Sequence, residues 1–140
     1  MDALYTAEAL SVGDARNGQA YLADRSLDLR MSVPKEMGGA GDGANPEQLF
    51  ALGYAACFHS ALKLVASKAK ADTTDSAVGA RVSIGSNAAG GFELAVALEV
   101  SLPNVPVEQA RELAEAAHQV RPYSNATRGN IEVTVEVVED

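Results

Sequence analysis

The feature that most constrains the fold is a long apolar segment that carries the only cysteine of the chain, Cys57. The segment begins at Asn45-Pro46 and continues to about Lys70. Asn45 is a favourable helix N-cap, Pro46 suits the first helical position, and Gln48 completes the spacing of a capping box. The first half of the segment is apolar nearly all round. The sequence therefore predicts a helix over about 45–70 that is buried on most of its sides.

Strands are predicted on both sides of this helix. They are expected within residues 3–32, where turn residues separate short alternating stretches, and over 78–84, 92–102 and 131–137, where apolar and polar residues alternate. A second helix is expected from about residue 106, because Val107, Ala110, Ala114 and Ala117 recur three or four residues apart. This order predicts an α+β fold, with helices covering antiparallel sheets, in a single domain over residues 1–140.

Composition excludes several classes of protein. The formal net charge of -8 and the scattered basic residues argue against binding nucleic acid, which needs clustered Lys and Arg. A single cysteine forms no internal disulfide, so no oxidising compartment is implied. The N-terminus lacks the pattern of a signal peptide. The apolar stretch 49–65 is interrupted by His59, Ser60 and Lys63, which argues against a membrane span. A soluble cytoplasmic protein is expected.

Two interpretations of Cys57 stay open from the residues alone. Gly53, Tyr54, Ser60 and Ala61 share its face of the predicted helix, and three of the four are small, which leaves room for a ligand near the sulfur. A nucleophilic thiolate would need a cation nearby. Composition by itself favours the other interpretation, a buried and inert thiol, because free cysteines are among the most buried residues.

Three charged residues are ambiguous in the same way. Arg16 lies in a predicted turn and alone is typical of a solvated surface residue. Glu47 lies in the first helical turn, where a carboxylate is stabilised by the helix dipole even without another role. Arg121 continues the inward-facing stripe of the second helix, so it either needs a carboxylate partner or turns to water where the helix ends. His59 and His118 lack further ligands nearby, so no metal site is predicted.

Several motifs together resemble those of the organic hydroperoxide resistance proteins, a branch of the osmotically inducible protein superfamily. The resemblance covers nearly the whole chain, through the stretches 5–9, 16–18, 29–39, 45–62 and 118–131. Two stretches are highly specific: Asn45-Pro-Glu-Gln-Leu-Phe-Ala-x-Gly-Tyr-Ala-Ala-Cys-Phe58 and Pro122-Tyr-Ser-Asn-Ala-Thr-Arg-Gly-Asn130.

The resemblance implies a thiol peroxidase that reduces organic and fatty-acid hydroperoxides to alcohols. Cys57 matches the peroxidatic cysteine, Arg16 the arginine that stabilises its thiolate, and Glu47 the glutamate that holds this arginine. The implied fold is an intertwined homodimer with long central helices and two active sites at the subunit interface. The implied reductant is a dithiol such as dihydrolipoamide, and no metal or other cofactor is needed.

The chain departs from the family pattern at residue 121. The pattern His-x-x-Cys-Pro-Tyr-Ser contains a second, resolving cysteine, whereas this chain has His118-Gln-Val-Arg121-Pro-Tyr-Ser. A Cys57 sulfenate would then wait for an external thiol, so impaired turnover is expected. By helical spacing Arg121 is expected to lie near Cys57.

The alkyl part of the peroxide is expected to contact apolar residues around the helix, which are Leu49, Phe50, Tyr54 and Phe58. Two other classes remain open. One is a catalytically inactive or single-turnover family member that binds apolar ligands, with Arg121 and Glu47 paired. The other is a structural dimer in which Cys57 is inert.

Overall fold

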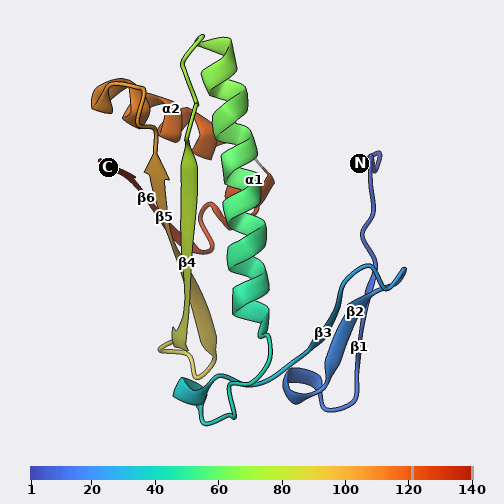
Figure 1. Ribbon diagram of the computed structural model, residues 1–140. Coiled ribbons are helices and arrows are strands. Elements are labelled where there is room, and N and C mark those ends of the chain that lie inside the picture. The colour runs from blue at the N-terminus through green and yellow to red at the C-terminus, as the bar shows by residue number, and fades with distance from the viewer. Residues whose placement is uncertain (121, 140) are drawn as a thin grey trace. The chain divides into compact units, whose positions relative to one another are not determined.

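The computed structural model describes all residues except 121 and 140. The chain divides into two compact units, Met1–Leu49 and Phe50–Asp140, which are described separately (Figure 1). The interpretation of residues 1–140 as a single domain stays a prediction.

The N-terminal unit contains a small antiparallel sheet. Its strands are β1 (Ala9–Val12), β2 (Gln19–Leu22) and β3 (Asp28–Arg30), in the order β1-β2-β3. Short 3₁₀ turns follow at η1 (Ala15–Asn17), between β1 and β2, and at η2 (Lys35–Met37), after β3. Strands and turns over residues 3–32 were expected from the alternation, and the structure confirms them.

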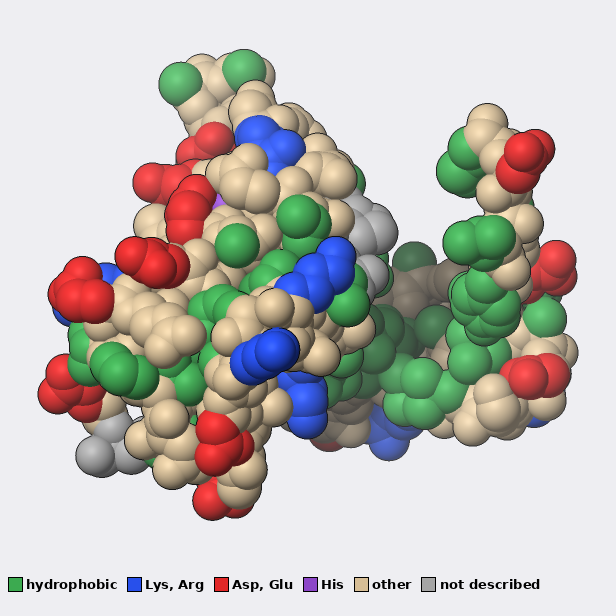
Figure 2. All heavy atoms as spheres, turned by 90° about the horizontal axis from the view of Figure 1, so that it is seen from above, with side chains coloured by type: hydrophobic (Ala, Val, Ile, Leu, Met, Phe, Trp, Pro, Cys, Tyr) green, Lys and Arg blue, Asp and Glu red, His purple; other side chains and the backbone are tan. Residues whose placement is uncertain are grey.

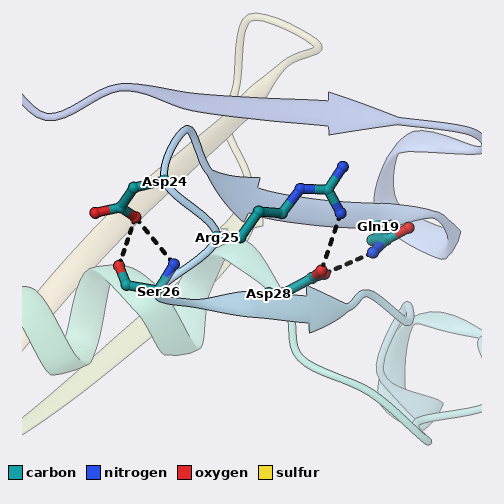
Figure 3. A network of polar contacts seen from close by, with 5 residues as sticks. All are labelled: Gln19, Asp24, Arg25, Ser26 and Asp28. Carbon is teal, nitrogen blue, oxygen red and sulfur yellow. Dashed lines mark hydrogen bonds and ion pairs between the residues drawn. The ribbon is translucent and has the colours of Figure 1, made fainter.

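Side chains fix the turn between β2 and β3 (Figure 3). Ser26 donates hydrogen bonds from its backbone N–H and its hydroxyl to Asp24 Oδ1, over 2.9 and 2.6 Å. Arg25, with a φ of 63°, donates to Asp28 Oδ2 over 3.3 Å and lies 3.7 Å from the centroid of the Tyr21 ring. A residue such as arginine rarely adopts this left-handed conformation, so the contacts of Asp24 and Asp28 stabilise the turn against its backbone cost.

The predicted long helix is confirmed as α1 (Pro46–Lys68). Its N-terminus has a reciprocal cap, because Asn45 Oδ1 accepts from the Gln48 N–H over 2.9 Å and Gln48 Oε1 accepts from the Asn45 N–H over 3.0 Å. These two bonds satisfy backbone donors that a helix start leaves without partners.

The C-terminal unit holds a second sheet of three strands, in the order β4-β5-β6. Its elements are β4 (Ala77–Ser86), β5 (Phe92–Ser101), α2 (Val107–Val120), α3 (Pro122–Thr127) and β6 (Glu132–Val138). β4 and β5 form the predicted antiparallel hairpin. β6 is parallel to β5, so the expectation of antiparallel pairing does not hold there. The reason is that α2 and α3 form a crossover connection, which returns the chain to the end of the sheet where β5 began.

One face of this sheet carries the core of the C-terminal unit. Alternate residues of the strands, such as Val96, Leu98 and Val100 of β5, pack against α1 and α2. Both helices contribute to the same buried cluster, and α1 lies alongside the sheet over much of its length (Figure 1). The opposite face exposes polar residues such as Arg81 and Glu99. The α+β class is therefore confirmed.

α1 ends at Lys68, close to the predicted end near residue 70. Among the described residues it alone is long and apolar enough to cross a membrane by length and composition. The polar residues within the stretch 49–65 therefore do not by themselves exclude a membrane span. Its residues Tyr54, Phe58, Leu62 and Ala66 are nevertheless buried in the protein core. α1 is a core helix.

The negative charge is distributed rather than concentrated. Figure 2 shows acidic side chains at several separate places on the face in view, with hydrophobic side chains between them. Such a surface favours solubility.

Candidate functional site

Cys57 lies in the middle of α1 and is half-buried. Its neighbours Tyr54, Phe58 and Ala61 are almost fully buried. Cys57 therefore lies beside core residues of α1 without being fully buried itself.

Arg16 and Glu47 form a bidentate ion pair in the N-terminal unit. Arg16 Nη2 lies 3.0 Å from Glu47 Oε1, and Nη1 donates to Oε2 over 3.1 Å. The hydrogen bond from Arg16 lowers the pKa of the Glu47 carboxyl, and burial opposes this shift. The same bond raises the pKa of Arg16. The pair brings together residues that each looked ordinary in the sequence, a surface arginine and a helix-capping carboxylate.

The backbone around Arg16 explains the Arg16-Asn17-Gly18 motif. Arg16 lies in η1, where two residues just before it, Gly13 and Ala15, have left-handed backbone with φ of 77° and 48°. Gly18 closes this turn so tightly that a Cβ there would lie 2.3 Å from the Val12 carbonyl oxygen. Asn17 Oδ1 accepts from the backbone N–H of Val33 over 3.0 Å. The motif therefore fixes the loop from which the Arg16 side chain reaches Glu47.

Glu47 and Cys57 are ten residues apart on the continuous helix α1. At 1.5 Å per residue, about 15 Å of helix axis separates them, so they do not touch within one helix. The action of Arg16 and Glu47 on Cys57 stays a prediction. Residue 121 and its predicted proximity to Cys57 lie outside the described residues.

The predicted substrate residues divide into two groups. Leu49 and Phe50 are half-buried and keep exposed surface. Tyr54 and Phe58 are 0% and 1% exposed, and both fill the core of the C-terminal unit. Within the described residues, no group of three or more His, Cys, Asp or Glu side chains is arranged to hold a metal ion.

Sequence reasoning missed an aromatic cluster built around Tyr123. The Tyr123 ring stacks on Phe50 at a centroid distance of 6.0 Å and meets the Tyr54 ring edge-on at 5.6 Å. It also covers Gly53, where a Cβ would lie 3.1 Å from the Tyr123 hydroxyl oxygen. Gly53 lies one helical turn before Cys57 and on the same face. The small residue at 53 therefore admits an aromatic ring from α3.

A buried group of hydroxyls was missed as well. Tyr54 Oη lies 3.1 Å from Thr127 Oγ1 and 3.4 Å from Ser124 Oγ, and Ser124 Oγ lies 2.9 Å from His118 Nδ1. The spacing of Ser124 and Thr127, three residues apart in a short helix, was a usable signal because it puts both on one face. Their partner Tyr54 is about half the chain away and gave no local signal.

The chain matches the family model described as OsmC-like protein over residues 39–136. An organic hydroperoxide resistance protein of Xanthomonas axonopodis pv. citri is 48% identical over 134 residues, which cover 94% of this chain and 93% of the relative. The structure of an organic hydroperoxide resistance protein from Elizabethkingia anophelis, with bound thiocyanate, is 50% identical and superposes with a TM-score of 0.93, covering 100% of both chains.

A third similar protein is an organic hydroperoxide resistance protein of Vibrio cholerae with captopril bound in one of its active sites. It is 50% identical, with a TM-score of 0.90, and 98% of this chain and 94% of that chain are covered. The fold and these matches define an OsmC-like protein. Within that family the chain belongs to the organic hydroperoxide resistance branch, a group of peroxidase-type oxidoreductases.

Proposed function

We propose that this protein is a thiol peroxidase that reduces organic hydroperoxides to alcohols through Cys57. Membership of the organic hydroperoxide resistance branch supports the substrate class. The observation that carries the chemistry is the bidentate Arg16–Glu47 pair, because it joins the two charged residues that the family resemblance assigned to one site. A half-buried thiol on the core helix supplies the nucleophile.

The first step is a displacement at oxygen. The Cys57 thiolate attacks the distal oxygen of ROOH, an S–O bond forms and the O–O bond breaks. The leaving alkoxide takes a proton from water to give ROH, and Cys57 is left as a sulfenic acid. In this proposal Arg16 supplies the positive charge that stabilises the thiolate, and Glu47 orients Arg16 through its two hydrogen bonds.

The apolar surroundings of Cys57 select the substrate. Phe50 and Leu49 keep exposed surface that an alkyl or aryl group can cover. Tyr54 and Phe58 are almost fully buried in the chain, and the Tyr54 ring packs edge-on against Phe50. Burying the alkyl part of the substrate contributes free energy that hydrogen peroxide cannot supply, so organic hydroperoxides are preferred.

The second step needs an external reductant, because residue 121 is an arginine. One thiol of a dithiol such as dihydrolipoamide attacks the Cys57 sulfenic acid, which forms a mixed disulfide and releases water. The second thiol then attacks this disulfide, which returns Cys57 to the thiol and leaves the reductant as a cyclic disulfide. Without an intramolecular thiol this route competes with over-oxidation of Cys57, so turnover is weak.

We infer that the protein acts as an intertwined homodimer in the cytoplasm. α1 is apolar on most sides, yet Leu52 is 68% exposed and Leu64 is 43% exposed. A second copy of the chain would cover this surface. A cytoplasmic location agrees with a free cysteine that depends on a reducing dithiol.

A single-turnover assay tests the proposal. The protein is mixed with one equivalent of cumene hydroperoxide, and the cumyl alcohol released is measured for the unaltered chain and for Cys57→Ser. We expect about one equivalent of alcohol from the unaltered chain and none above background from the variant. Equal release from both, or none from either, contradicts the proposal and favours a ligand-binding or structural role.

The role of Arg16 is tested by the rate of Cys57 alkylation against pH. Arg16→Ala is expected to move the alkylation profile of Cys57 to higher pH, because a stabilising charge is lost. Arg25→Ala, which removes an arginine of the β2–β3 turn, serves as the control and should leave the profile unchanged. An unchanged profile in Arg16→Ala would show that Arg16 does not activate the thiol.

A further inference from the structure

The chain segment that follows β3 contacts the turn η1, which carries Arg16. The Met31 N–H donates to the Gly18 carbonyl over 2.9 Å, and the Val33 N–H donates to Asn17 Oδ1 over 3.0 Å. Asn17 is the residue directly after Arg16 in η1. The side chain of Asn17 therefore ties the turn that carries Arg16 to the residues that follow β3.

The other side of the same segment contacts the residues that lead into α1. The Ser32 N–H donates to the Ala44 carbonyl over 2.8 Å, and Ser32 Oγ accepts from the Asp42 N–H over 3.2 Å. Ala44 directly precedes Asn45, whose side chain caps α1, and Glu47 lies in the first turn of this helix. Ser32 therefore ties the start of α1 to the residues that follow β3.

Ser32 is the most deeply buried residue of the N-terminal unit, Met1–Leu49, all of which the structure describes. It is 3% exposed, and Met31 is the only other buried residue of this unit. Burying a hydroxyl is unfavourable unless it is hydrogen-bonded. A methyl group would fill the space without this requirement, so the hydroxyl specifies where the backbone at Asp42 lies.

The bidentate Arg16–Glu47 pair depends on the separation of the two parts of the backbone that carry it. A guanidinium and a carboxylate form two parallel hydrogen bonds only when they approach each other in one geometry. In this pair the contacts are 3.0 and 3.1 Å. Because residues 31–33 bind the Arg16 turn on one side and the approach to Glu47 on the other, they set how far apart η1 and the first turn of α1 lie.

We propose that Asn17 and Ser32 are positioning residues for the Arg16–Glu47 pair. Asn17 holds the turn that carries Arg16 against one side of the segment 31–33, and Ser32 holds the chain that precedes Glu47 against the other side. Through Arg16 the two residues also affect the thiol, and this part of the inference rests on the proposed peroxidase function.

The test measures the pKa of Glu47 by NMR titration of the protein with isotopically labelled glutamate. In the folded protein the hydrogen bond from Arg16 is the main cause that lowers this pKa. Arg16→Ala should therefore raise the pKa, and this rise is the reference. Asn17→Ala and Ser32→Ala should each produce roughly half of the reference rise or more, because loss of one of the two parallel bonds weakens the pair.

Two controls separate positioning from general destabilisation. Asn87→Ala removes a similar bond in the other unit, where Asn87 Oδ1 accepts from the Gly91 N–H over 3.0 Å, and it should leave the pKa of Glu47 unchanged. In a chain that already carries Arg16→Ala, Asn17→Ala should cause no further rise, because Asn17 acts through Arg16.

The pKa of Glu47 decides the proposal. If Asn17→Ala or Ser32→Ala folds and leaves this pKa unchanged, the positioning role of that residue is overturned. A rise of equal size with and without the Arg16 side chain overturns the role of Asn17 as well. Asn17 is exposed to solvent, so Asn17→Ala keeps the test decisive if the buried Ser32→Ala variant does not fold.

The effect on the thiol is measured separately, from the alkylation rate of Cys57 against pH. Asn17→Ala should move the profile to higher pH, as Arg16→Ala does, but by a smaller amount. If Arg16→Ala moves the profile and Asn17→Ala does not, the pair is not positioned for the thiol by Asn17, and that part of the inference is overturned. If Arg16→Ala leaves the profile unchanged, the proposed function loses its activating arginine, whereas the titration of Glu47 still decides the positioning role.

Discussion

We predict that the Arg16–Glu47 ion pair contributes to the free energy of unfolding, which can be measured without an activity assay. A double-mutant cycle with Arg16→Ala and Glu47→Gln isolates the coupling free energy between the two side chains. The bidentate geometry, with contacts of 3.0 and 3.1 Å, favours a strong pair. Arg16 is 42% exposed, however, and solvent screens its charge. The expected coupling is therefore about 0.5–1 kcal/mol at neutral pH and low salt.

The coupling free energy between Arg16 and Glu47 should also decrease at low pH. The pKa of Glu47 is lowered from its ordinary value of 4.5 in the folded protein, mainly by the hydrogen bond from Arg16. A carboxyl with a lowered pKa stabilises the folded state fully above its unfolded pKa, and loses this contribution as pH falls through its folded pKa. The coupling should thus be constant above about pH 5 and decline below pH 4.5.

Urea unfolding at fixed protein concentration measures the cycle, because oligomerisation would otherwise change the apparent stability. Arg30 and Asp42 form an ion pair in the same unit with side chains 66% and 57% exposed, and they provide the control cycle. We expect a smaller coupling there. A coupling of zero for Arg16–Glu47, or one that rises as pH falls below 4.5, would refute the reasoning.

Three further predictions follow from other parts of the molecule. Asn45→Ala should destabilise the protein by about 1 kcal/mol in urea unfolding, because it removes the bond from the Gln48 N–H to the N-cap side chain; a loss below about 0.3 kcal/mol would contradict the cap's role. Leu52→Glu should weaken the homodimer in light scattering because it puts a charge on exposed apolar α1 surface, whereas Phe92→Glu, 69% exposed at the hairpin end of β5, should not. Arg121→Cys should raise steady-state turnover with dihydrolipoamide, and equal rates in both proteins would mean that a thiol at 121 is dispensable.

Local signals predicted much of the fold. The start of α1 followed from Asn45 and Gln48, because a capping box involves residues only three positions apart. The hairpin of β4 and β5 followed from alternation of apolar and polar residues. The parallel direction of β6 did not follow from the sequence. It depends on the end of the sheet to which the connection through α2 and α3 returns the chain. Alternation looks the same in both directions.

The site was predictable only in part from the residues. Arg16 and Glu47 each looked unremarkable in isolation, and the resemblance to a family, rather than spacing, put them together; they lie 31 residues apart in sequence. The hydroxyl cluster was missed because Tyr54 and Thr127 are 73 residues apart. A buried hydroxyl can be recognised only when its partner in the folded chain is known.

The most direct test of the peroxidase proposal is the intact mass of the protein after one equivalent of cumene hydroperoxide, with and without dihydrolipoamide. We predict that the mass rises by one oxygen atom on Cys57, that excess peroxide adds further oxygens, and that prompt addition of dihydrolipoamide restores the original mass. No disulfide should form within the chain. A protein whose mass is unchanged by the hydroperoxide, while Cys57 remains open to alkylation, would contradict the proposal that this thiol is the peroxidatic nucleophile.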